Sequence, residues 1–159
     1  MKKMMLVCLM LMIAASSVAA GEKNKTSQSE MEIIYESSGI EKKNDKFHLL
    51  DNTDIEVEPN IKRVDLNGDG IDEVFVILNN YSGAYGNAEG NLILLIKGKN
   101  KKFNKNIDYP VTAYSILKNK FKGYPDIDLT IPGYCSSVWR WDGEKYNFFK
   151  KKCVQGYKE

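Results

Sequence analysis

The pattern of apolar and polar residues predicts a chain built mainly from β-strands. Two runs, Val74 to Leu78 and Leu92 to Ile96, carry apolar side chains at consecutive positions, which is typical of strands covered on both faces. Shorter or alternating runs predict further strands at 47–50, 54–57, 103–107, 114–117 and 127–131. Pro59 is expected to end the second of these. The segment Met31 to Ile40 fits the strand period and the helix period equally poorly, so a strand and a short helix both stay open.

A hairpin near the C-terminus is the clearest local signal. Asp-Gly lies between two aromatic-rich runs, which is typical of a tight turn between antiparallel strands. If 142–145 form a four-residue loop, Trp141 faces Tyr146 and Trp139 faces Phe148. The two tryptophans then share one face of their strand.

The same hairpin register brings two cysteines close together. Cys135 falls opposite Lys152, one residue from Cys153, so a single bulge would join the two sulfurs. Cysteines of exported chains usually pair, because oxidising compartments favour the disulfide. We therefore expect a Cys135–Cys153 disulfide that contributes about 3 kcal/mol to stability.

The first twenty residues are expected to be a secretory signal peptide. Lys2 and Lys3 precede an apolar run from Met4 to Ala15, and small residues occupy the positions before a cleavage site after Ala20. The run is too short to span a bilayer. The expected location is therefore periplasmic or secreted, in a bacterium and more specifically a Gram-negative one.

The remaining chain is expected to form one domain. Residues 21–30 are polar without periodicity, which predicts a flexible segment, and residues 31–159 form the domain. The predicted fold class is mainly β: a single antiparallel β-rich domain, either a meander or a sandwich, with a C-terminal hairpin and room for one short N-terminal helix.

Charge restricts the classes of partner. The whole chain has 23 basic and 21 acidic residues, and without Lys2 and Lys3 the two totals become 21 and 21. A neutral chain has no overall field that attracts nucleic acid. After the signal no apolar stretch is long enough to cross a bilayer. We expect neither a nucleic-acid partner nor a membrane span.

One segment, 65–73, has the composition of a metal-binding loop. Oxygen-bearing side chains stand at its first, third, fifth and ninth positions, and a glycine at the sixth permits a sharp turn. Calcium takes six to eight oxygen ligands, and alternate residues of a tight loop point toward one centre. The candidate ligands are Asp65, Asn67, Asp69 and Glu73, with the carbonyl of Ile71 at the seventh position.

This spacing resembles the calcium loops of FG-GAP and VCBS type repeats, which are β-rich extracellular modules. The resemblance covers about 61–78 and implies side-chain ligand roles for Asp65, Asn67, Asp69 and Glu73, and a structural calcium as cofactor. The loop occurs once and no Phe-Gly or Gly-Ala-Pro element accompanies it, so a multi-bladed propeller is not expected. An acidic turn closed by Asx hydrogen bonds without metal is the alternative. The C-terminal run also resembles that of small exported bacterial proteins carrying one such loop, which implies no activity.

No catalytic residues are predicted. His48 is the only histidine, and no serine nucleophile elbow is present. Asp126 and Asp128 share one strand face roughly 7 Å apart, a separation that glycosidases use. A solvated strand face is the simpler interpretation of this pair.

Aromatic residues supply the candidate partner-binding positions. The glycine-rich stretch 79–90 is too long for a plain connection and carries Tyr81 and Tyr85, and rigid aromatics in loops are typical protein anchors. Trp139 and Trp141 add a second aromatic face. The leading hypothesis is an exported, calcium-stabilised binding module, such as an inhibitor or immunity-type protein acting on a cell-wall-directed enzyme. The alternative is a glycan-binding protein or hydrolase that uses the two aspartates and the tryptophan face.

Overall fold

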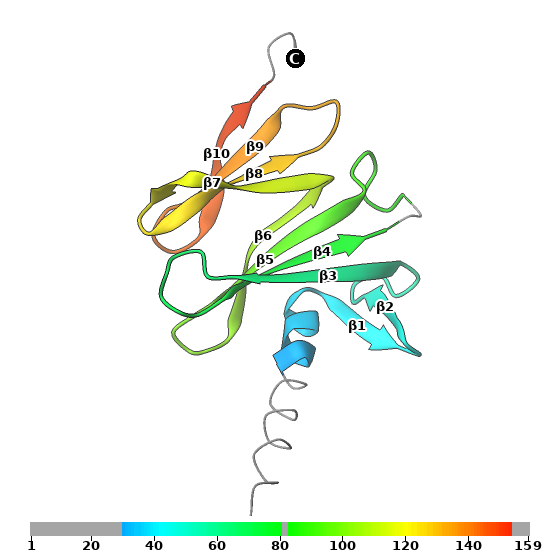
Figure 1. Ribbon diagram of the computed structural model, residues 1–159. Coiled ribbons are helices and arrows are strands. Elements are labelled where there is room, and N and C mark those ends of the chain that lie inside the picture. The colour runs from blue at the N-terminus through cyan, green and yellow to red at the C-terminus, as the bar shows by residue number, and fades with distance from the viewer. Residues whose placement is uncertain (1–29, 81–82, 154–159) are drawn as a thin grey trace, which may run out of the picture. The chain divides into compact units, whose positions relative to one another are not determined.

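The chain forms two antiparallel sheets. The computed structural model describes residues 30–80 and 83–153 (Figure 1). The first sheet has six strands in the order β1-β2-β3-β4-β5-β6, and the second has four in the order β10-β9-β8-β7. The strands are β1 (Ile40–Lys43), β2 (Lys46–Leu49), β3 (Glu56–Val64), β4 (Glu73–Asn79), β5 (Gly90–Lys97), β6 (Phe103–Val111), β7 (Ala113–Phe121), β8 (Tyr124–Thr130), β9 (Ser136–Trp141) and β10 (Tyr146–Lys152). The predicted fold class, a β-rich antiparallel domain, is confirmed.

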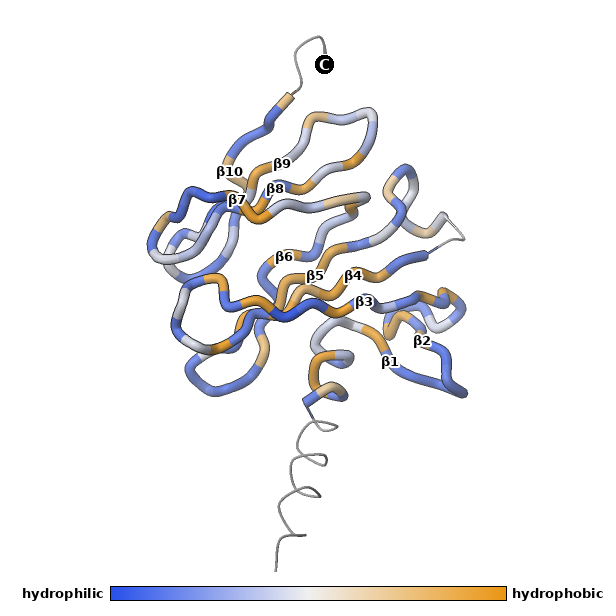
Figure 2. The backbone as a smooth tube through the Cα atoms, viewed as in Figure 1, coloured by the Kyte–Doolittle hydropathy of each residue, from blue (hydrophilic) through white to orange (hydrophobic). Residues whose placement is uncertain are grey.

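The centre of the six-stranded sheet is buried on both faces, as its apolar runs predict. Phe75 of β4 pairs with Leu94 of β5, and both belong to the core that faces the second sheet. Their neighbours Val74 and Val76 point to the opposite face and are fully buried there. Figure 2 shows the resulting apolar colouring along β4 and β5, with polar residues at the turns.

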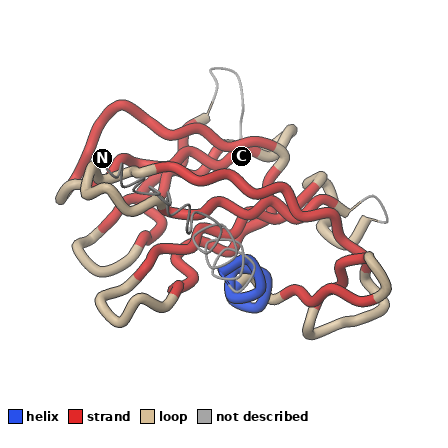
Figure 3. Tube along the Cα trace, turned by 60° about the horizontal axis from the view of Figure 1, so that its bottom comes forward, coloured by secondary structure: helices blue, strands red, loops and turns tan. Residues whose placement is uncertain are grey.

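A short helix covers the face of the six-stranded sheet that carries Val74 and Val76. Residues 30–37 are helical, which decides the assignment that the sequence leaves open, and Figure 3 shows this helix against the strands. Ile34 is fully buried, and the Ser38 hydroxyl donates to the Ile34 carbonyl oxygen over 2.7 Å. The chain divides into the units Met1–Met31 and Glu32–Glu159, and both sheets belong to the second. The predicted signal peptide lies outside the described residues, as does nearly all of the flexible segment.

The second sheet packs one face against the first. Ile127 and Leu129 of β8, with Trp141 and Tyr146 of the terminal hairpin, join the same core as the apolar residues of β4 and β5. Burying apolar side chains from both inner faces is what holds the two layers of a sandwich together.

Pro59 does not end its strand, contrary to the expectation. β3 continues through Pro59 to Val64, and Pro59 pairs with Leu78 of β4. β2 reaches β3 only at Glu56 and Val57, so the missing N–H of Pro59 faces no strand on its other side.

The terminal hairpin and the disulfide are confirmed. Trp141 pairs with Tyr146 and Trp139 with Phe148, and the register shifts between Phe148 and Lys150. That bulge lets Cys135 and Cys153 form a disulfide that closes the end of the hairpin. Within the described residues no helix has the length and apolar character needed to cross a membrane.

Candidate functional site

The loop from Asp65 to Glu73 wraps around the Asp65 carboxylate. Gly68 and Gly70 adopt φ of 87° and 83°, the left-handed region that favours glycine. Their amides donate to Asp65 over 2.7 and 2.9 Å, and the Asp69 amide donates over 3.2 Å. These backbone hydrogen bonds stabilise the charged carboxylate and hold the pKa of Asp65 below its usual value.

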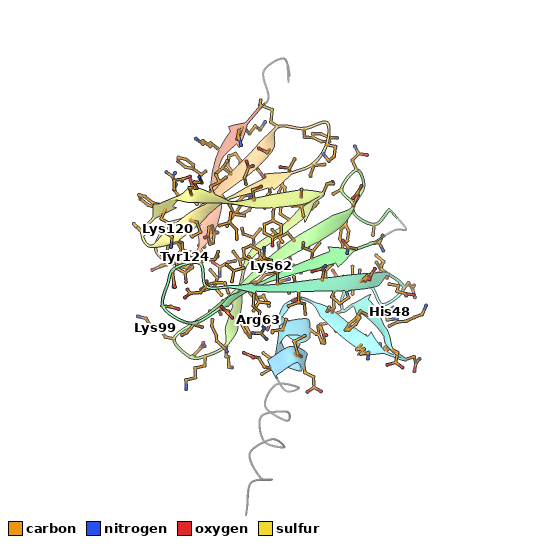
Figure 4. The ribbon with its side chains drawn as sticks, viewed as in Figure 1. His48, Lys62, Arg63, Lys99, Lys120 and Tyr124 are labelled. Carbon is orange, nitrogen blue, oxygen red and sulfur yellow. A yellow bond between two sulfur atoms is a disulfide. The ribbon has the colours of Figure 1, made fainter. Side chains whose placement is uncertain are left out.

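Two side chains of β7 and β8 attach this loop to the second sheet (Figure 4). The Tyr124 hydroxyl donates to Glu73 Oε1 over 3.0 Å and accepts from Asn67 Nδ2 over 2.9 Å. Lys120 Nζ donates to the Leu66 carbonyl oxygen over 2.8 Å. Glu73 is 2 % exposed, and this burial raises its pKa.

The donor chemistry of the loop fits a hard cation. Its side chains offer carboxylate and amide oxygens, which are the ligands calcium prefers. Asn67 and Asp69 lie together, with Asn67 Nδ2 donating to Asp69 Oδ2 over 2.8 Å. The Ile71 side chain is 49 % exposed, which leaves its backbone as the contribution to the loop. Among the described residues no three carboxylate, imidazole or thiolate groups converge as a metal-binding cluster, and calcium stays a prediction.

The tryptophans of the predicted aromatic face point into the core. Trp141 is 9 % exposed, and the Trp139 ring lies 5.7 Å from the Tyr109 ring of the first sheet. Their shared strand face is therefore the one that packs between the sheets, where both indoles stabilise the fold.

Of the two tyrosines predicted as partner-binding residues in the glycine-rich loop, the structure describes one. Tyr81 lies outside the described residues. Tyr85 is partly buried, and its hydroxyl is shielded from solvent without a hydrogen-bond partner. Burial raises the pKa of Tyr85, with the nearby carboxylates of Asp108 and Asp51 adding to the effect. Tyr85 is thus anchored by its ring rather than displayed at a loop tip.

The expected solvated strand face is wrong for Asp126 and Asp128, which are 2 % and 6 % exposed. Both are engaged in ion pairs, with Arg140 of β9 and Lys152 of β10. Arg140 holds Asp126 through Nε–Oδ1 and Nη2–Oδ2 contacts of 2.9 and 2.7 Å. Lys152 Nζ lies 2.9 Å from Asp128 Oδ2. The Arg140 guanidinium is the main cause that holds the pKa of Asp126 below its usual value, which does not suit a general acid.

Arg140 also contacts two exposed aromatic rings of the second sheet. Its Cζ lies 3.6 Å from the ring centroid of Phe149 and 5.3 Å from that of Phe121. Lys122 and Lys150 flank these rings at 5.7 and 5.6 Å. Both phenylalanines are 44 % exposed. We call these five residues the aromatic–cation face.

Sequence reasoning missed this face, although one signal for it was present. Phe148 and Phe149 are consecutive, so in a regular strand they would point to opposite faces and at least one ring would face away from the core. Phe148 is 55 % exposed and Phe149 lies at the bulge, where it reaches Arg140. The two rings and Phe121 also line a shallow hollow of about 170 Å³.

Comparisons with known proteins add no relative to these observations. No protein-family model, no curated protein and no solved structure matches this chain. The resemblance of the loop to FG-GAP and VCBS repeats therefore rests on its residues alone.

Proposed function

We propose that this chain is an exported binding module that recognises an acidic protein surface through the aromatic–cation face. The observation that carries this proposal is the packing of Arg140 between Phe121 and Phe149, whose rings stay 44 % exposed. Arginine and large aromatic side chains supply most of the binding energy in protein interfaces.

The charge of the face determines the kind of partner. Lys122, Arg140 and Lys150 bring three positive charges, and Asp126 forms an ion pair with Arg140. The Asp126 carboxylate is 2 % exposed, so a partner meets the cations and the rings first. Opposite charge speeds encounter and excludes basic partners.

The loop 65–73 has a supporting role in this proposal. Bound calcium would be held by Asp65, Asn67, Asp69, Glu73 and the Ile71 carbonyl, and would neutralise carboxylates at the junction with Tyr124. An inhibitor or immunity-type protein is the case in which the acidic partner is a cell-wall-directed enzyme. The ion-paired aspartates and inward tryptophans favour this class over a hydrolase.

Affinity capture from periplasmic extract tests the proposal with matched variants. The double variant Phe121→Ser/Phe149→Ser removes both rings, and Ile33→Ser removes an apolar side chain of similar exposure, 45 %, from the helix. We expect wild type and Ile33→Ser to retain the same acidic protein and the double variant to lose it. Retention should weaken with salt, because the cations contribute to encounter. Equal capture by all three proteins would contradict the proposal, and ring-dependent retention on peptidoglycan would favour the glycan-binding alternative.

A further inference from the structure

A cavity of about 410 Å³ lies on the helix-covered side of the six-stranded sheet. Its apolar wall includes Leu78 and Ile93, which point to that face from β4 and β5, and Leu49 at the end of β2. The helix end, the glycine-rich loop and β6 complete the lining, so six separate segments meet there. A volume of this size is within the range of small-ligand pockets.

Polar groups also line this cavity. Tyr85 contributes its ring to the lining, and its hydroxyl is buried without a hydrogen-bond partner. A buried hydroxyl without a partner costs free energy, which a ligand that hydrogen-bonds it would recover. Asp51 and Asp108 also line the cavity, and both lie close enough to Tyr85 to raise its pKa.

The charges around the hydroxyl favour a cation. Asp108 accepts from Asn91 Nδ2 over 2.6 Å and from Lys105 Nζ over 2.7 Å, so its charge is already balanced. Asp51 has no ion pair among the described residues. With Lys105, Asp108 and Asp51 counted together, the cavity carries one net negative charge.

We propose that this cavity binds a primary ammonium group carried on a short apolar chain. The ammonium donates to the Tyr85 hydroxyl oxygen and to Asp51, and the hydrocarbon chain lies against Leu78 and Ile93. The same chemistry belongs to a free alkylamine and to a lysine side chain of a peptide. The cavity and the aromatic–cation face share no residue, so this site is independent of the proposed function.

Matched probes distinguish the head group from the apolar chain. Purified protein is titrated with hexylamine, 1-hexanol and hexanoate, which share one hydrocarbon body, and amide chemical shifts locate the site. We expect hexylamine to bind in saturable fashion, with the largest shifts at residues lining the cavity. Hexanol should bind about tenfold more weakly, because it lacks the charge that Asp51 pairs with. Hexanoate should bind more weakly still, because the carboxylates repel it.

Two variants and one control tie the binding to named groups. Tyr85→Phe keeps the ring but removes the hydroxyl, and we expect about fivefold weaker hexylamine binding. Asp51→Asn removes an exposed charge with little effect on the fold and should weaken binding similarly. Tyr109→Phe removes a tyrosine hydroxyl on the opposite face of the sheet, where Tyr109 packs against Trp139, and should change nothing.

A second arm separates the two sources of the ammonium. A capped tripeptide with a central lysine is compared with its norleucine analogue. Tighter binding of the lysine peptide than of hexylamine assigns the site to a peptide side chain, and weaker binding assigns it to a free amine. The proposal is overturned if hexanoate binds as well as hexylamine, if no probe binds saturably at the cavity, or if both variants leave hexylamine affinity unchanged.

Discussion

The two sheets expose their outer faces to a very different extent. The six-stranded sheet is covered on one side by its partner sheet and on the other by the helix (Figure 1), and Val74, Phe75 and Val76 are all fully buried. The four-stranded sheet buries Ile127 and Leu129 on its inner face but displays Phe121 and Phe149 on its outer face. The six-stranded sheet thus has buried apolar residues on both faces. The four-stranded sheet, here called the display sheet, has a core on its inner face and exposed aromatic rings on its outer face.

This difference in coverage determines where charged side chains can be accommodated. Between two apolar layers a charged side chain would lose its hydration without compensation. On the open face of the second sheet, Asp126 and Arg140 keep a bidentate ion pair while the rings beside them stay available to a partner. Partner binding is therefore expected on the outer face of the four-stranded sheet.

Truncating one aromatic ring in each sheet should give the largest contrast. Phe75→Ala leaves a cavity in the shared core and should lower the free energy of unfolding by about 3–5 kcal/mol. Phe149→Ala removes a half-exposed ring and its contact with Arg140, and should lower it by only about 1 kcal/mol. Urea denaturation measures both. Equal losses of unfolding free energy in the two variants would mean that Phe149 belongs to a core, and would contradict its assignment to an exposed binding surface.

Removing the disulfide tests how much this covalent bond contributes to the stability of the fold. Cys135 and Cys153 are separated by 18 positions, and replacing both with serine should cost about 3 kcal/mol because the unfolded chain is no longer constrained. Denaturant unfolding with and without reductant gives the value, and the serine variant should be indifferent to reductant. Two alkylatable thiols in protein from oxidising conditions would contradict the bond.

Acid should weaken the display sheet through Asp126. Its folded-state pKa lies below the ordinary value of 3.8 because Arg140 stabilises the carboxylate, so the contribution is full above that value. It is lost as the pH falls below 3.8 and through the folded-state pKa. Asp126→Asn should lower the Tm by several degrees at neutral pH and flatten its fall in acid. An acid profile in Asp126→Asn that matches wild type would assign the acid dependence to other groups.

Calcium should produce the smallest effect, at the junction of the two sheets. At millimolar calcium, the weak affinity typical of extracellular modules should stabilise the fold by about 1 kcal/mol, or a few degrees in Tm. Asp69→Ala should abolish this difference between calcium and chelator. Tyr124→Phe should reduce it, because the Tyr124 hydroxyl positions Glu73 and Asn67. The same shift in Asp69→Ala as in wild type would argue for a loop closed by Asx hydrogen bonds alone.

The features that were predicted well depend on residues close together in sequence. The double-sided run of β4 and the pairing of Trp139 with Phe148 follow from the strand period and from a turn of known length. Even the bulge that joins Cys135 to Cys153 follows from counting along one hairpin. Local sequence does not predict whether Pro59 ends its strand, because that depends on whether a neighbouring strand needs the missing N–H group.

The sequence by itself determined the fold class, the hairpin register and the disulfide, because strand period, turn length and residue spacing are local properties. Only the tertiary structure decided which strand faces became core. Trp139 and Trp141 share a face, but nothing local says whether that face meets a second sheet or solvent. Likewise, Tyr124 comes to Glu73 and Tyr85 comes to Asp108 across long stretches of chain. Contacts of this kind depend on how the sheets stack, which is a collective outcome of burying apolar area.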